Sequence, residues 1–295
     1  FSKELKIDTY KSDVKHLMST EYRNYLSNTK VNSLSQVNGW MDAYVETEMS
    51  GIKIKNSFEA GLHKIDLGID TSTRNWNGKK YFSNALFLPV DATGVNNDMN
   101  TNTDDAQEQI NLTKMVDPYF MPDVDTNNKA LFGKTSVDLG NINLEVGARY
   151  DRTNIKANQT AKSMNALADK DKDYNAFSAN ILATMKATND LKYFAGIGKS
   201  SRVPDGKELY QGTNVMGDLE QTTNKEIDLG VDFNTGSFGV KTKLFHSILS
   251  DYIYYSAASS KYVNTDAKII GLELSSYQTF TDTISLDFGA SYQKG

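Results

Sequence analysis

The sequence predicts an all-β protein, an antiparallel transmembrane β-barrel to which this chain contributes about eleven strands. Three observations predict it. Apolar and polar residues alternate with a period of two through most of the chain, as they do in strands with one apolar and one polar face. No stretch has a helical period or reaches the about 18 consecutive apolar residues of a membrane-spanning helix. Short and long connections alternate, as in barrels whose turns are short on one side of the membrane and whose loops are long on the other.

The clearest strands are residues 142–151, 226–233 and 284–292. In the first, the even positions are apolar and the odd positions are polar, charged or glycine. The apolar faces of all three contain no charge, which a lipid-facing surface requires because Arg or Lys at the middle of the bilayer costs about 2–4 kcal/mol. We therefore expect Leu144 and its even-numbered neighbours to contact lipid, and Glu145 and Arg149 to line the lumen.

The connections between these strands fall into two groups. Tight turns are predicted at residues 60–61, 139–141, 189–190, 235–236 and 281–282. Longer polar connections are expected at residues 19–40, 76–124, 156–173, 201–221 and 256–263. A soluble β-sandwich is the alternative, but its loop lengths have no reason to sort by side. The chain begins at Phe1 and ends at Gly295 within a strand pattern, so we expect a piece of a longer protein.

Composition excludes several classes of protein. The 32 basic and 37 acidic residues give a net charge of −5, which lacks the electrostatic footprint of a nucleic-acid binder. The absence of cysteine excludes disulfides, Cys-ligated zinc, iron–sulfur clusters and a thiol nucleophile. The mean hydropathy is −0.52, but 16 Tyr, 13 Phe and 2 Trp supply the bulky groups that disordered chains lack.

Motifs for catalysis or cofactor binding fail on their spacing. The segment 196–200 ends like a phosphate-binding loop, but Tyr193 stands where the first glycine is needed. The segment 123–127 opens like a calcium loop, but Asn128 and Lys134 replace the required Gly and Glu. The three histidines lie on different predicted strands, with no nucleophile elbow and no zinc-protease motif. The sequence therefore predicts no enzymatic activity and no resident cofactor.

One short pattern has metal-binding chemistry. His16 and Met18 are two residues apart near the end of the first predicted strand, about 5–18, so both side chains project from the same face. A neutral imidazole beside a thioether suits copper better than calcium or magnesium. The pair is a candidate metal site, and a lumen-facing histidine beside a packing methionine is the alternative that the residues leave open.

Several segments resemble the barrel of TonB-dependent outer-membrane receptors. Residues 201–210 resemble the family's "R-x-P-x-x-x-E-L-Y" segment, residues 264–273 its "N-x-x-A-x-I-x-G-x-E" strand, and residues 147–151 its "G-x-R-Y-D" strand. Residues 219–230 resemble "L-x-P-E-x-S-x-x-x-E-x-G" less closely. In that segment Gln221, Thr222, Asn224 and Asp228 depart from the usual residues. The matches occur in the family's order over roughly residues 140–295.

The first strand is similar to that of the copper-receptor subgroup. Tyr10, Val14, His16 and Met18 match its "Y-x-x-x-V-x-H-x-M" pattern. In that subgroup the His-x-Met of the barrel pairs with a Cys-x-x-x-Met in the plug. Only His16 and Met18 can be carried over to this chain, because no plug segment is present in its sequence. The resemblance therefore implies copper as a possible substrate held partly by these two residues.

The resemblance implies a fold and a function. Such receptors form barrels of about 22 strands whose lumen is plugged, and TonB moves the plug. We accordingly expect residues 1–295 to be a partial β-barrel domain, with the plug domain and TonB box absent from this chain. We expect it in the cell outer membrane, with lipid, TonB and a metal or metal-chelate substrate as partners and no nucleic acid. The expected function is TonB-dependent uptake of a scarce nutrient. A passive or structural outer-membrane barrel and a soluble binding module are the alternatives.

Overall fold

The computed structural model describes residues 2–19, 29–31, 34–37, 41–83, 86–89, 114–158, 171–210 and 218–295. Nearly all of these residues lie in strands, and one short helix, α3 (Gly206–Tyr210), lies between two of them. The predicted all-β class is confirmed. No helix among the described residues has the length and apolar character needed to cross a membrane.

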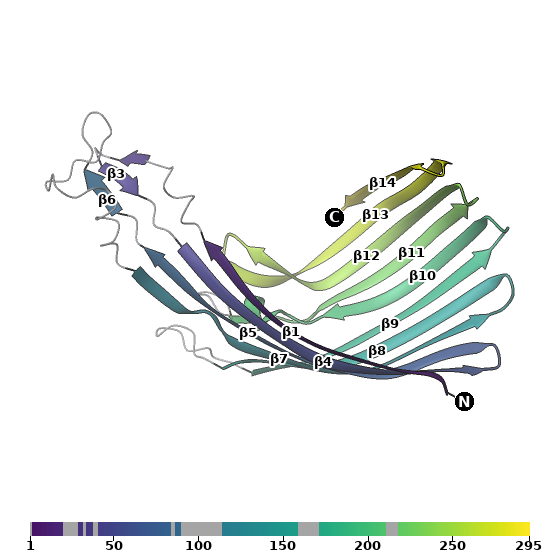
Figure 1. The fold of residues 1–295 in the computed structure, drawn as a ribbon, viewed down its shortest axis with the longest axis horizontal. Helices are drawn as coiled ribbons and strands as arrows, with labels where there is room; N and C mark the ends of the chain where they lie inside the picture. The colour runs from purple at the N-terminus through teal and green to yellow at the C-terminus, as the bar shows by residue number, and fades with distance from the viewer. Residues whose placement is uncertain are drawn as a thin grey trace.

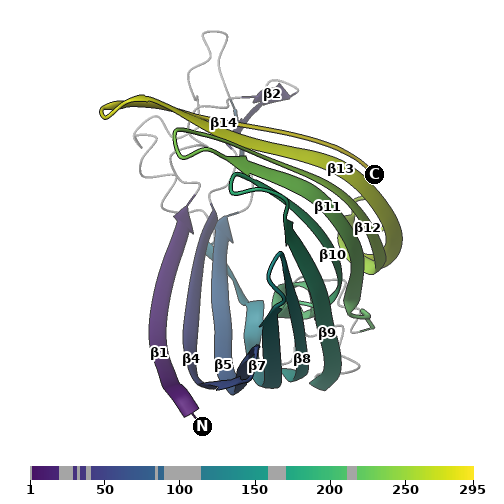
Figure 2. The same ribbon diagram turned by 90° about the vertical axis from the view of Figure 1, so that its right-hand side faces the viewer.

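Eleven strands form one antiparallel sheet, as predicted, and they follow one another across it in chain order. The strands are β1 (Ser2–Ser19), β4 (Met41–Ala60), β5 (His63–Ser83), β7 (Lys114–Asp138), β8 (Ile142–Ala157), β9 (Asp171–Lys186), β10 (Leu191–Arg202), β11 (Thr222–Asn234), β12 (Phe238–Ser256), β13 (Lys261–Thr281) and β14 (Ile284–Lys294). Figures 1 and 2 show the sheet curved into an open trough, with β1 and β14 along its two rims. The sheet does not close on itself.

The short connections lie together at one end of this sheet, which we call the turn end, near the amino terminus (Figure 1). Gly61, Gly140 and Gly236 adopt positive φ angles of 59°, 84° and 90° there, a region that glycine enters without a steric penalty. The opposite end, which we call the loop end, carries the long connections. The predicted sorting of short turns and long loops to opposite ends is confirmed.

The long connections are shorter than the sequence predicted. Residues 76–83 continue β5, and residues 114–124 begin β7, although both ranges were expected to be loop. Three short strands at the loop end, β2 (Thr29–Val31), β3 (Leu34–Val37) and β6 (Leu86–Pro89), form a separate small sheet that was not expected either. The alternation fails there because apolar residues stand at consecutive positions, as in Met115–Val116 and residues 119–121, and because Pro118 and Pro122 are typical of loops.

The register assigns each side chain to a face. Trp76 lies opposite Val124, and Val124 lies opposite Ala157, and these three pack together on the concave side of the sheet. We call this side the lumen face and the convex side the outward face. Glu145 and Arg149 share the lumen face with Ala157, because residues two apart on a strand point the same way.

The outward face between the turn end and the middle of the strands is an apolar band. Its side chains are open to the surroundings, and examples are Ile69, Leu131, Ile142, Val146, Ile197, Ile227, Leu229, Ile270, Leu272 and Phe288. No second large sheet packs on this band within the described residues. A β-sandwich would bury these positions in a central core, so the sandwich alternative is excluded and the predicted apolar outer face is confirmed.

Candidate functional site

The helix α3 lies on the lumen face near the loop end, and its sequence explains why it begins where it does. Pro204 disfavours helical geometry in the residue before it. Asp205 then acts as the N-cap, and its Oδ1 accepts a hydrogen bond of 3.0 Å from the backbone N–H of Lys207. Glu208 reaches back, so that its Oε2 accepts 2.7 Å from the N–H of Asp205. This reciprocal capping box satisfies two backbone donors of a helix too short to be stable alone.

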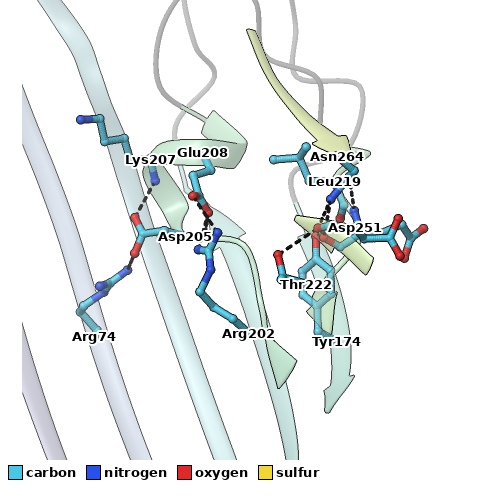
Figure 3. Close-up of polar contacts among 11 residues, drawn as sticks. Arg74, Tyr174, Arg202, Asp205, Lys207, Glu208, Leu219, Thr222, Asp251 and Asn264 are labelled. Atoms are coloured by element: carbon cyan, nitrogen blue, oxygen red, sulfur yellow. Dashed lines mark hydrogen bonds and ion pairs between the residues drawn. The ribbon is translucent and has the colours of Figure 1, made fainter. Parts of the chain in front are cut away.

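Two arginines hold this helix against the barrel wall, as Figure 3 shows. Arg74 of β5 forms an ion pair of 2.6 Å with the Oδ2 of Asp205. Arg202, the last residue of β10, donates two hydrogen bonds of 2.9 and 3.1 Å to the two carboxylate oxygens of Glu208. Two parallel bonds between a guanidinium and a carboxylate restrict both position and orientation. The segment that resembles "R-x-P-x-x-x-E-L-Y" is therefore a capped turn fastened to the lumen face.

The last two residues of the helix complete an apolar cluster under it. Leu209 and Tyr210 are fully buried, and the Tyr210 hydroxyl donates 3.1 Å to the carbonyl of Ile155. The cluster is formed by Val124, Ile155, Ala157, Tyr174, Leu209, Tyr210, Leu219 and Ile253. It is the main group of buried apolar side chains among the described residues, so the wall is thickest at the loop end of the lumen face.

The chain that returns from α3 to β11 is fastened by side chains of two strands, β9 and β13. The Tyr174 hydroxyl of β9 donates 2.8 Å to the carbonyl of Leu219. Asn264 of β13 accepts 2.9 Å from the N–H of Glu220 and donates 3.1 Å to its carbonyl. Its amide also donates 2.7 Å to the carbonyl of Asp251 (Figure 3). Asn264 thereby joins the return segment to the irregular part of β12, where Asp251 has a φ of 56°.

Tyr262 closes the side of this cluster, at the loop end of β13 and beyond the apolar band. It packs against the buried residues and meets the ring of Tyr255 edge-on at 5.4 Å. Burial, followed by the negative charge of Glu208, raises the pKa of the Tyr262 hydroxyl above its ordinary value. The hydroxyl is therefore neutral throughout the physiological range.

Ion pairs cover the lumen face on the turn-end side of the apolar cluster. Arg149 contacts Asp151 at 2.8 Å and Asp70 at 3.3 Å. Lys243 contacts Glu273 at 3.2 Å and Asp228 at 3.7 Å. Between these two groups lies a shallow hollow of about 440 Å³ whose floor includes Gly133, Gly147 and Gly198. The lumen face is thus polar, with small residues between opposite charges.

Aromatic rings lie over glycines on the same face. Phe132 lies opposite Gly68, and Phe194 lies opposite Gly230. A Cβ at either glycine would overlap the ring and a backbone carbonyl. The ammonium of Lys53 lies 4.9 Å from the centre of the Phe132 ring, and that of Lys241 lies 5.2 Å from the centre of the Phe194 ring. Each ring is therefore held flat between backbone and cation.

The structure places His16 and Met18 on the lumen face of β1. They lie opposite Val45 and Ala43 of β4, and those residues share a face with Thr47, which pairs with Trp76. Ala43 is buried, whereas Met18 is about half exposed. The carboxylates of Asp13, Glu46 and Glu48 lie close enough together to hold an ion, but they stand on the outward face, and the group does not include His16.

Sequence reasoning missed most of the contacts that hold α3. The segment 201–210 was recognised, but Arg74 is 131 residues away from Asp205 along the chain, and no local pattern links them. No sequence pattern pointed to Tyr174 either. Asn264 belongs to a family-like strand pattern, but that pattern does not indicate its contacts with the return segment. A lone charged or aromatic residue in a strand carries no signal of its partner.

Comparison with known proteins identifies the family of the chain. The family model described as "TonB dependent receptor-like, beta-barrel" matches residues 6–295. No curated protein matches the chain. Among solved structures, the copper transporter OprC has a TM-score of 0.71 at 18% identity, over 99% of this chain and 43% of its own length.

Two further similar structures are a ferric yersiniabactin uptake receptor and a siderophore receptor. The ferric yersiniabactin uptake receptor FyuA from Yersinia pestis has a TM-score of 0.61 at 11% identity, over 99% of this chain and 40% of its own. The siderophore receptor PiuA from Acinetobacter baumannii has a TM-score of 0.61 at 16% identity, over 99% and 44%. The chain spans less than half the length of each of these proteins. The chain belongs to the TonB-dependent receptor family, and residues 6–295 are a segment of its β-barrel.

Proposed function

We propose that this chain is part of the wall of a receptor that takes up copper or a metal chelate across the bacterial outer membrane with energy delivered by TonB. The observation that carries the proposal is the match of residues 6–295 to the TonB-dependent receptor barrel. The apolar band faces lipid, and the polar lumen face lines the path of the substrate. A plug domain and TonB box, supplied by sequence outside residues 1–295, would complete the transporter and contact TonB.

The geometry of the lumen face supports this role. An open trough of eleven strands leaves the edges of β1 and β14 unpaired, and unpaired backbone groups in lipid cost several kcal/mol each. Strands from the remainder of the protein therefore close the barrel. The charged hollow and the fastened α3 then face the enclosed space, where they can contact a plug and a polar substrate.

Copper is the substrate that we favour. His16 and Met18 lie on the same lumen-facing side of β1, so an imidazole and a thioether are available together to a soft metal ion. The structural similarity to the copper transporter OprC agrees with this choice. Two donors alone bind copper weakly, so we expect further ligands from the plug. An iron chelate is the second candidate, because FyuA and PiuA are similar in fold.

The proposal is tested by uptake of radioactive copper into cells that express the intact receptor, with and without a functional tonB gene. Accumulation that requires both the receptor and TonB supports the proposal. Receptor-dependent accumulation that persists without TonB would show a passive barrel instead. TonB-dependent uptake of a ferric chelate but not of copper would assign the substrate to the second candidate.

A further inference from the structure

Lysines follow the apolar band on the outward face at the loop end. On β10, β11 and β13 the band ends with Ile197, Ile227 and Ile270, each at least half exposed. The next outward position towards the loop end is a lysine in every case, namely Lys199, Lys225 and Lys268. The transition from isoleucine to lysine thus occurs at the edge of the lipid-facing surface, where a long cationic side chain reaches the headgroup layer.

The register places these three lysines in one row. Lys199 lies directly opposite Lys225, Lys225 lies opposite Ile248, and Ile248 lies opposite Lys268. Strands are spaced about 4.8 Å apart, so the row from Lys199 to Lys268 spans on the order of 14 Å. Like charges directly opposite one another destabilise a sheet. The row therefore places three positive charges at the edge of the apolar band, and the two that lie directly opposite each other repel.

Protein groups do not neutralise this row within the part of the chain that the structure describes. The ion pairs found there include none of the three lysines. Lys199 lies 5.9 Å from the ring centre of Phe177, which carries no net charge. Asp266, one outward position beyond Lys268, accepts a hydrogen bond from the N–H of Asp251. By contrast, the lumen-facing Lys243 contacts two carboxylates.

The row is specific to one side of the membrane. Outward positions near the turn end of the same strands are Leu191 and Tyr193 on β10, and Val231 and Phe233 on β11. None of these can attract an anion. A second pair of cations at the loop end, Lys129 opposite Arg152, repeats the arrangement on β7 and β8. On β10 and β11 the positive charge of the outward face therefore lies at the loop end, on the side of the outer leaflet.

We propose that Lys199, Lys225 and Lys268 bind the phosphate-bearing headgroup of a lipid in the outer leaflet, whose acyl chains lie along Ile197, Ile227 and Ile270. The inference rests on the membrane location in the proposed function and adds a lipid partner to it. Phosphate oxygens accept charge-assisted hydrogen bonds from ammonium groups, and a row of lysines beside an apolar surface satisfies both parts of such a lipid at once. Binding relieves the repulsion between Lys199 and Lys225.

The test uses the intact receptor in a neutral detergent, with diphosphoryl lipid A as the probe and phosphatidylcholine as the comparison lipid. Bound lipid is counted by native mass spectrometry. The triple variant Lys199→Gln, Lys225→Gln, Lys268→Gln should bind lipid A on the order of 100-fold more weakly than the parent, since each lysine near a membrane surface contributes severalfold. Binding of phosphatidylcholine should be the same in both.

A matched control removes the same number of charges from the lumen face, through Lys53→Gln, Lys192→Gln and Lys241→Gln. It should bind lipid A like the parent. The heat-dependent gel shift of the barrel reports whether each variant folds. If the triple variant does not fold, the single variant Lys225→Gln provides a milder change. Lys225→Gln should bind lipid A severalfold more weakly than the parent.

Three results would overturn the inference. Equal binding of lipid A by the parent and the Lys225→Gln variant would show that the row does not hold the headgroup. An equal loss in the lumen-face control would show an effect of net charge alone. Full displacement of lipid A by millimolar inorganic phosphate would show a site for free anions. The assay measures no transport, so its outcome is independent of whether copper uptake requires TonB.

Discussion

Arg74 and Asp205 are joined by an ion pair of 2.6 Å although one belongs to the middle of β5 and the other begins α3. Asp205 uses its other carboxylate oxygen to cap the helix through the N–H of Lys207. One carboxylate thereby sets both the start of the helix and its position on the wall. The capped turn is thereby held at the loop end of the lumen face.

Replacing Arg74 with Ala should loosen α3 without unfolding the barrel. Both partners are about one-third exposed, so the pair contributes about 1 kcal/mol. Hydrogen exchange of the backbone amides in residues 205–210 should accelerate severalfold. Lys134→Ala is the control, because it removes an ion pair with Glu145 elsewhere on the lumen face and should leave this exchange unchanged. Unaltered protection in the Arg74 variant would mean that the cap alone holds the helix.

Two substitutions at Tyr210 should separate its hydroxyl from its ring. Tyr210→Phe removes only the hydrogen bond to the Ile155 carbonyl and should destabilise the segment by about 1 kcal/mol. Tyr210→Ala empties a fully buried site and should destabilise it by about 3–5 kcal/mol. Proteolysis of the 203–221 region in the intact receptor would rank the variants. Equal cleavage of parent and Tyr210→Ala would contradict the role given to the apolar cluster.

Gly230 should tolerate no side chain. A Cβ there would overlap the ring of Phe194 and the backbone carbonyl of Thr242, so Gly230→Ala should destabilise the barrel by about 1–3 kcal/mol. Gly198 also faces the lumen, but a Cβ there would have no neighbour nearer than 3.8 Å. Gly198→Ala should therefore fold like the parent. The fraction of receptor that shows the heat-dependent gel shift measures both, and equal fractions would refute the argument from packing.

His16→Ala should abolish stoichiometric copper binding by the intact receptor and leave the barrel folded, because the imidazole is one of the two donors in the proposed copper site. Met18→Leu should weaken binding while keeping the side-chain volume. The control is His63→Ala, which changes a histidine at the turn end of β5. Metal analysis of the purified proteins gives the stoichiometry. Copper that is retained by His16→Ala, or absent from the parent, would make the pair ordinary lining of the lumen.

The loop end shows why part of the fold escaped prediction. Asn75 of β5 donates to Asp123 and Asp125 of β7 at 2.7 and 2.8 Å on the outward face. Asp123 therefore belongs to a paired strand, although residues 76–124 were expected to be a loop. In residues 114–124 apolar residues stand side by side and two prolines interrupt them, so the period of two that identifies a strand in the apolar band is absent.

The sequence by itself determined the all-β class, the number of strands in the large sheet, and the face to which Leu144, Glu145 and Arg149 belong. It could do so because successive side chains of a strand point to opposite faces and one face of these strands carries no charge. Only the tertiary structure decided that α3 folds onto the lumen wall, that Arg74 holds Asp205, and that Lys199, Lys225 and Lys268 stand in one row. Those relationships depend on pairing register and curvature across strands far apart in the chain, and no local pattern of residues encodes them.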